Sequence, residues 1–172
     1  MSLKKLAAIA AVALVSTAAS AQTAKTDFFG EVAYTATTYK ASGLSGSWSP
    51  SAIRGVVGMG FHENFAVEGM LLIGATDSNN LGVNLKLTSG AGIYLKPRAK
   101  LGDDVEVFAR LGWANVNSKV ANIDTKDNGA SYGLGASYAF NKTTNVNVDY
   151  MMYNDSNGAK IDGISVGVGF KF

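Results

Sequence analysis

Ionisable side chains recur at alternate positions along several apolar segments of this 172-residue sequence. Alternate residues of an extended chain lie on the same face, so within each segment these groups point to one side. Acids and bases are mixed among them, and an isolated ion removed from water carries a large desolvation cost. We therefore expect opposite charges to pair across a shared interior, either as a fixed network or as a narrow ion path. The positions are Glu31, Arg54, Glu68, Lys86, Lys96, Arg98, Lys100, Glu106, Arg110 and Asp149.

No catalytic, cofactor or metal site is predicted. The sequence has one histidine, His62, and no cysteine. A nucleophile needs a neighbouring base, and a metal ion needs several ligands, so a lone histidine supports neither. We interpret the residues around His62 as a turn and expect no catalytic residue, no cofactor, no metal ion and no enzymatic activity.

The last segment, residues 161–172, has two chemically different faces. Small or polar residues occupy one face, with glycine at positions 163, 167 and 169. This period of two predicts a strand with lipid on one side and a narrow interior on the other. The bare inner face leaves room for long Arg and Lys side chains from other strands. The apolar face consists of Ile164, Val166, Val168, Phe170 and Phe172.

Seven further segments alternate in the same way. The eight predicted strands are 28–39, 52–61, 65–74, 82–101, 105–116, 130–140, 146–153 and 161–172. The connections between them alternate long and short: 40–50, 62–64, 75–81, 102–104, 117–129, 141–145 and 154–160. Such alternation is typical of a membrane barrel with its short turns on the periplasmic side. The sequence therefore predicts an all-β, eight-stranded antiparallel transmembrane up-and-down β-barrel with both termini in the periplasm.

The first 21 residues have the pattern of a secretory signal peptide. Lys4 and Lys5 precede an apolar run, Leu6–Val15, and Ala19 and Ala21 have the spacing of a cleavage site. A run of this length is too short for a spanning helix. We expect a signal peptide at 1–21 and a barrel domain at 22–172. Without the two lysines, the 15 basic residues fall to 13, equal to the 13 acidic residues, so no nucleic-acid partner is expected.

Other residues mark the expected membrane boundaries and loops. Pro97 predicts a bulge or local break in its strand, because proline cannot donate a ladder hydrogen bond. Trp48 falls in a Gly/Ser-rich connection and is expected at a solvated loop tip. Aromatic residues lie at strand ends, as a membrane girdle requires: Phe28, Phe61, Phe65, Phe140, Phe170 and Phe172 at the periplasmic ends, and Tyr39, Trp113, Tyr132 and Tyr153 near the opposite ends.

The sequence resembles the small OmpA/OmpX-like outer-membrane β-barrel proteins of Gram-negative bacteria. The signal peptide, the GFHENFAVEG segment at Gly60–Gly69 and the GVGFKF ending carry the resemblance. It implies a location in the outer membrane, contact with its lipid and lipopolysaccharide, and passage through periplasmic chaperones and the barrel assembly machinery. It also implies that the apolar face of the last strand is the assembly signal, with Phe172 as the terminal aromatic. We expect a monomer.

Three functions are open to such a barrel. Eight strands enclose an interior just wide enough for side chains to fill, which favours a structural, membrane-integrity role with a charge-paired lumen. A narrow, porin-like channel for ions or small solutes is the alternative, and surface recognition or adhesion through the outer loops is a weaker one. An enzyme of the outer leaflet is not expected, because His62 lies on the predicted periplasmic side. The predicted lumen network consists of Glu31, Arg54, Glu68, Lys96, Arg98, Glu106, Arg110 and Asp149.

Overall fold

Long antiparallel strands make up nearly all of the computed structural model, which describes residues 26–41, 46–80, 82–120, 123–156 and 159–172. The strands are β1 (Asp27–Ala41), β2 (Ser51–His62), β3 (Phe65–Thr76), β4 (Ser78–Asn80), β5 (Val83–Lys100), β6 (Val105–Val120), β7 (Ile123–Ala139), β8 (Thr144–Ser156) and β9 (Ala159–Lys171). The described residues contain no helix that is long and apolar enough to cross a membrane.

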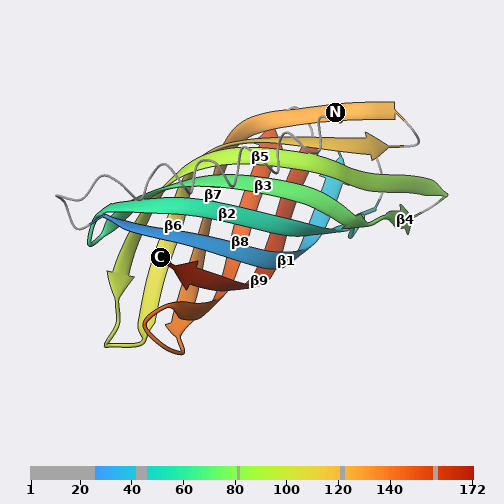
Figure 1. Ribbon diagram of the computed structural model, residues 1–172. Coiled ribbons are helices and arrows are strands. Elements are labelled where there is room, and N and C mark those ends of the chain that lie inside the picture. Colours follow the sequence, from blue (N-terminus) through green and yellow to red (C-terminus); the bar gives the residue numbers. More distant parts are fainter. Residues whose placement is uncertain (1–25, 42–45, 81, 121–122, 157–158) are drawn as a thin grey trace, which may run out of the picture.

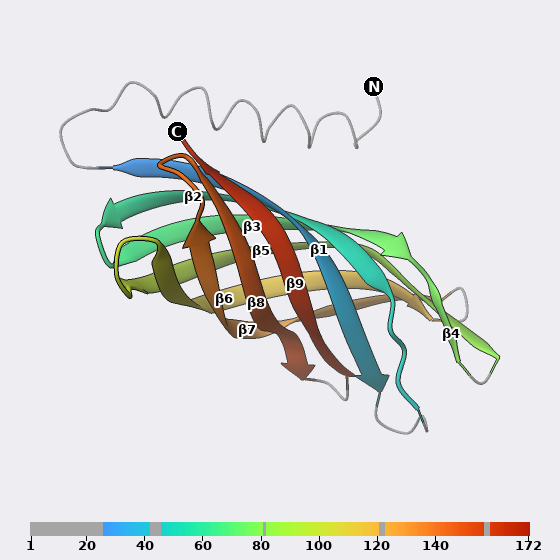
Figure 2. The same cartoon turned by 90° about the horizontal axis from the view of Figure 1, so that it is seen from below.

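The eight long strands close into a barrel (Figures 1 and 2). Each strand pairs with its neighbours in sequence, β1 also pairs with β9, and β3 pairs directly with β5. Closure leaves no unpaired edge among these strands, which removes the sites at which open sheets aggregate. The three-residue β4 only extends the β3–β5 hairpin at its tip. The predicted eight-stranded antiparallel barrel is thus confirmed.

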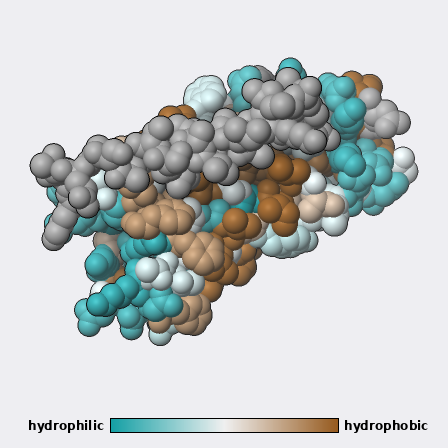
Figure 3. All heavy atoms as spheres, in the orientation of Figure 1, coloured by the Kyte–Doolittle hydropathy of each residue, from teal (hydrophilic) through white to brown (hydrophobic). Residues whose placement is uncertain are grey.

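The two faces of each strand differ as the alternation predicted. Along β1, Val32 and Tyr34 are exposed while Ala33 and Thr35 are buried, and the other strands repeat this pattern. On the face shown in Figure 3, exposed apolar side chains lie in a belt across the middle of the barrel and hydrophilic surface lies towards its ends. Such a belt is the surface that a barrel in lipid presents to the hydrocarbon layer.

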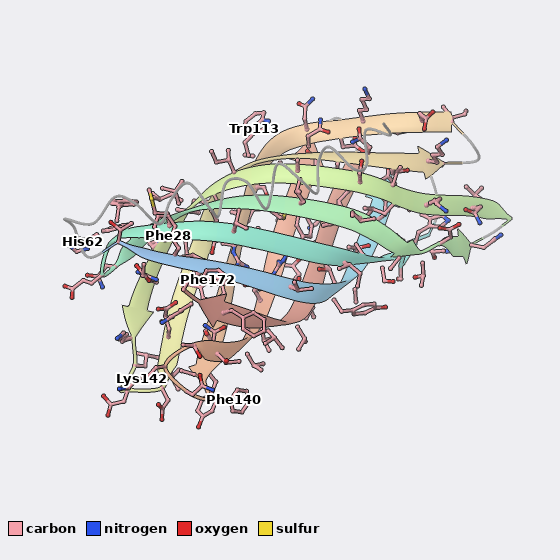
Figure 4. All side chains as sticks on the ribbon, in the orientation of Figure 1. Phe28, His62, Trp113, Phe140, Lys142 and Phe172 are labelled. Atoms are coloured by element: carbon pink, nitrogen blue, oxygen red, sulfur yellow. The ribbon has the colours of Figure 1, made fainter. Side chains whose placement is uncertain are left out.

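The two ends of the barrel differ in their connections. The termini end holds Asp27, Phe172 and the three short turns between β2 and β3, β5 and β6, and β7 and β8. The loop end is the opposite one, where β4 lies (Figure 1). The exposed aromatic residues at the termini end match the predicted girdle. Figure 4 labels Phe28, Phe140 and Phe172 at this end. It also labels Trp113, which is exposed on β6.

The strands at the loop end are longer than predicted. Residues 117–129, predicted as a loop, are mostly the paired ends of β6 and β7, whose register continues to Val120 opposite Ile123. Part of the predicted loop 75–81 forms β4. Polar residues on both faces concealed these extensions, because a hairpin that projects beyond the membrane needs no apolar face.

Bulges occur at positions other than the predicted one. The β5–β6 register is the same on both sides of Pro97, although Lys96 and Pro97 themselves have no partner in it, so the structure shows a local break without a bulge. The shift in β5 instead falls between Leu87 and Ser89. A second shift, between Met152 and Asn154 in β8, leaves Tyr153 as the extra residue.

The interior towards the loop end is filled by an apolar cluster, here called the loop-end core. Its members are Tyr39, Trp48, Ala52, Val56, Met70, Leu72, Leu85, Leu87, Tyr94, Ala114, Val116, Met151, Tyr153, Ala159 and Ile161. Tyr39 and Tyr153 therefore do not belong to the outer girdle, contrary to expectation. Trp48 was also placed wrongly, because it is only 1% exposed and donates from Nε1 to the carbonyl of Val83 at 3.0 Å. Its backbone pairs with Tyr39 in both directions, at 2.8 and 3.0 Å.

Candidate lumen ion-pair site

Six charged side chains from six strands meet inside the barrel between the loop-end core and the termini end. All six are buried, because each occupies an inward position of its strand. They are Glu31 of β1, Arg54 of β2, Glu68 of β3, Lys96 of β5, Arg110 of β6 and Asp149 of β8, and we call them the ion cluster. Three cations face three carboxylates, so the cluster has no formal net charge.

Arg54 joins two of the carboxylates. Its Nη2 lies 2.5 Å from Glu31 Oε1 and also bonds Asp149 Oδ2, while its Nη1 donates to Asp149 Oδ1 at 2.8 Å. Planar guanidinium groups suit such paired contacts, because their donors match the spacing of carboxylate oxygens. The Arg54–Asp149 pair spans the lumen between strands that are not neighbours in the sheet.

Arg110 contacts all three carboxylates. Its Nε donates to Glu68 Oε2 at 2.6 Å, its Nη1 to Asp149 Oδ2 at 2.7 Å and its Nη2 to Glu31 Oε2 at 2.9 Å. Removing this residue would take one direct cationic partner from every acid of the cluster. Arg110 is therefore the central cation of the site.

Lys96 lies at the edge of the cluster nearest the termini end. Its Nζ is 3.3 Å from Glu68 Oε1 and 3.9 Å from Glu106 Oε1, and it lies 4.2 Å from the centre of the Phe108 ring. Phe108 in turn covers Gly135 of β7, where a Cβ would come within 2.5 Å of the ring. A cation over an aromatic face gains electrostatic stabilisation. Glycine on β7 thus makes room for the ring that supports Lys96.

Arg98 belongs to a different contact, at the rim of the termini end. Its guanidinium bonds both carboxylate oxygens of Asp27, at 3.0 and 3.1 Å, and its Nε donates to the carbonyl of Glu63 at 3.1 Å. The structure therefore does not place Arg98 in the ion cluster, and Glu106 reaches it only through Lys96. Sequence reasoning did not single out Asp27.

Replacing Arg98 with alanine should have a small effect. Water reaches the pair from the carboxylate side, because the Asp27 side chain is 37% exposed whereas that of Arg98 is 7% exposed, and this screening weakens the pair. We expect the free energy of unfolding to fall by no more than about 1 kcal/mol. Urea titration of the protein refolded in phospholipid vesicles measures it. A loss as large as that from a substitution in the ion cluster would contradict this assignment.

Two other predicted inward charges point elsewhere. Lys86 is exposed and pairs with Asp77 at 3.5 Å, because the bulge between Leu87 and Ser89 reverses the faces of β5 beyond it. Lys100 is also exposed, at the end of β5. Asn147, which donates to Glu31 Oε2 at 3.1 Å, was missed. Its inward position opposite Gly167 was the available signal.

The cluster offers no reactive group. Its members are ionic partners of one another, and the described residues contain no group of three or more His, Cys, Asp or Glu side chains that could hold a metal ion. His62 is the last residue of β2, next to the β2–β3 turn at the termini end (Figure 4), and its Nδ1 accepts a hydrogen bond from the Asn64 backbone at 3.1 Å. The arrangement is chemically suited to neutralise charge inside a closed barrel.

Several solved structures of bacterial β-barrel proteins have the same fold. Ail, the attachment invasion locus protein of Yersinia pestis, aligns with a TM-score of 0.65 and 13% identity over 85% of this chain and 98% of its own. Neisserial surface protein A aligns at 0.63 and 17% identity, covering 84% and 97% of the two chains. The barrel domain of Pseudomonas aeruginosa OprF aligns at 0.54 and 14% identity, covering 83% and 97%. At such identities these structures are informative about the fold alone.

The sequence comparisons identify the family. No curated protein matches the chain. The family model described as outer membrane protein beta-barrel domain matches residues 7–172, nearly the whole sequence. The chain therefore belongs to the outer membrane protein beta-barrel domain family.

Proposed function

We propose that this outer-membrane barrel has a closed lumen and a structural role in membrane integrity. The observation that carries the proposal is the filling of the interior by two successive layers. The ion cluster joins β1, β2, β3, β5, β6 and β8 across the lumen, and the loop-end core fills the space beyond it. A solute would have to displace both layers to pass.

The barrel has a defined orientation in this proposal and contacts lipid, lipopolysaccharide and the assembly factors. The termini end, with its short turns, faces the periplasm, and the loop end faces outwards, as in barrels of this kind. Lipid covers the exposed apolar belt, and lipopolysaccharide surrounds the outer hairpins. Periplasmic chaperones and the barrel assembly machinery receive the chain through the outward face of β9, where Ile164, Val166, Val168, Phe170 and Phe172 are all exposed.

The narrow-channel alternative is weaker, although water has access from one side. A cavity of about 20 Å³ lies at the termini end beside Lys96, Arg98 and Glu106. This volume holds about one water molecule. Water can therefore approach the ion cluster from the termini end, but the loop-end core lies between the cluster and the other end.

Planar-bilayer recording of the purified, refolded protein tests the closed lumen. We expect no conductance step at neutral pH, because the ion cluster spans the lumen. The control is the Arg110→Ala variant recorded under the same conditions. Conductance steps in the wild-type protein that disappear in Arg110→Ala would contradict the proposal and establish the channel.

A further inference from the structure

A buried carboxylate oxygen without a hydrogen-bond partner lies at the loop end. Asp127 of β7 is 5% exposed, and its Oδ2 has no hydrogen-bond partner. Ser118 of β6 is also buried, and its Oγ likewise lacks a partner. Buried polar atoms are nearly always bonded, so an unpaired carboxylate oxygen calls for a physical explanation.

Asp127 is positioned against the loop-end core. Its register partner on β6 is Val116, a member of that core, and the carboxylate interacts electrostatically with the Tyr39 hydroxyl of β1. The backbone of Tyr39 is in turn paired with that of Trp48. Tyr39 therefore interacts with Asp127 through its hydroxyl and with Trp48 through its backbone.

Among the residues that the structure describes, no buried cation belongs to the loop-end core around Asp127. Tyr39, Tyr94 and Tyr153 are the titratable members of that core. The charged groups at the loop ends of β1 and β6–β9 occupy outward positions and are exposed or half-buried: Lys40, Lys119, Asp124, Lys126, Asp155 and Lys160. The buried Arg110 and Asp149 lie farther along β6 and β8, in the ion cluster. A proton is the remaining means of removing the charge of Asp127 while it stays buried.

We propose that Asp127 is a pH-dependent latch of the loop-end core: its protonated form keeps the Trp48 layer closed, and its ionisation favours opening of that layer to water. The inference rests on the proposed closed lumen. It adds a condition under which one of the two blocking layers loosens. The ion cluster, in which three cations balance three carboxylates, stays closed under that condition.

The direction of the pH dependence follows from the burial of Asp127. Asp127 lies beyond Trp113 and Tyr132 on the β6–β7 hairpin, outside the membrane-spanning belt. Burial raises the pKa of its carboxyl above the ordinary value. The closed form therefore binds the proton more tightly than the open form. Its stabilisation is complete below about pH 4, the ordinary value for aspartate, and is lost as pH rises through the higher pKa of the closed form.

Trp48 serves as the reporter of opening. The protein has two tryptophans, and Trp113→Phe leaves Trp48 alone. The full chain carrying this substitution is refolded in phosphatidylcholine vesicles, and the quenching of its emission by acrylamide is measured from pH 4 to 9. We expect the quenching constant to rise at least twofold with pH, because opening exposes the indole.

Two variants decide the result. Asp127→Asn, which keeps the shape and cannot ionise, should abolish the rise and hold quenching at its low value throughout. Asp124→Asn on the same hairpin is the matched control, because Asp124 is exposed and paired with Lys119, and it should leave the transition unchanged. Quenching that is independent of pH, or a transition that persists in Asp127→Asn, would overturn the latch. Either outcome leaves the closed lumen standing, since that is judged by conductance at neutral pH.

Discussion

Replacing Arg110 with methionine is expected to lower the free energy of unfolding by about 3–5 kcal/mol. The substitution keeps much of the side-chain volume but removes the cation that contacts Glu31, Glu68 and Asp149. The buried acids then outnumber their cations by one, and an uncompensated charge costs far more than the intact pair contributes. Urea titration in phospholipid vesicles measures the difference in the free energy of unfolding between the wild type and the variant. The folded fraction is read from the heat-dependent electrophoretic mobility.

A second substitution separates charge from packing. In the double variant Arg110→Met/Glu68→Gln, the remaining Arg54 and Lys96 face two carboxylates, so charge balance is restored. We expect the double variant to recover at least half of the lost free energy. A single variant that loses less than about 1 kcal/mol would show that the cluster behaves like an exposed ion pair.

Replacing Trp48 with alanine is expected to cost about 3–5 kcal/mol. The indole is almost fully buried in the loop-end core, and its Nε1 bonds the Val83 carbonyl, which would be left without that donor. The truncation therefore combines a large cavity with a lost hydrogen bond. The same urea titration and mobility assay applies, because neither depends on tryptophan fluorescence.

Trp113→Ala is the matched control for this prediction. Trp113 is 56% exposed on the outer face, so its removal leaves no interior cavity. Its effect should be clearly smaller than that of Trp48→Ala, while Trp48→Phe should fall between the two because it refills part of the space. Equal losses for Trp48→Ala and Trp113→Ala would contradict the burial of Trp48.

The sequence was sufficient to predict the barrel because lipid imposes a strict alternation. Within the membrane belt each strand must present apolar residues outwards, so the period of two identified both the strands and the inward charges. The inward positions of Glu31, Arg54, Glu68 and Arg110 are predicted directly by this alternation. The alternation does not predict the partner of each charge, because that depends on which strands face each other across the lumen.

Errors arose where the alternation is interrupted or no longer required. One extra residue in β5 turns Lys86 outwards, and one in β8 makes Tyr153 part of the interior. Neither bulge has a marker in the sequence, whereas Pro97, which suggested one, leaves the register unchanged. Beyond the membrane, polar residues suit strand and loop equally well. Trp48 lies in a Gly/Ser-rich connection, where only the tertiary structure reveals that it folds back into the barrel.

The distribution of the ion cluster over six strands has a consequence for how the protein is made. Arg54 and its partner Asp149 are 95 residues apart in sequence, and the carboxylates that Arg110 binds come from both sides of it. The β1–β2 hairpin can pair Glu31 with Arg54, but full charge balance also needs Asp149 of β8. A chain that stops before β8 would carry all three cations of the cluster and only two of its carboxylates, and an uncompensated buried charge is costly. The cluster therefore favours a closed barrel only once β8 is in place.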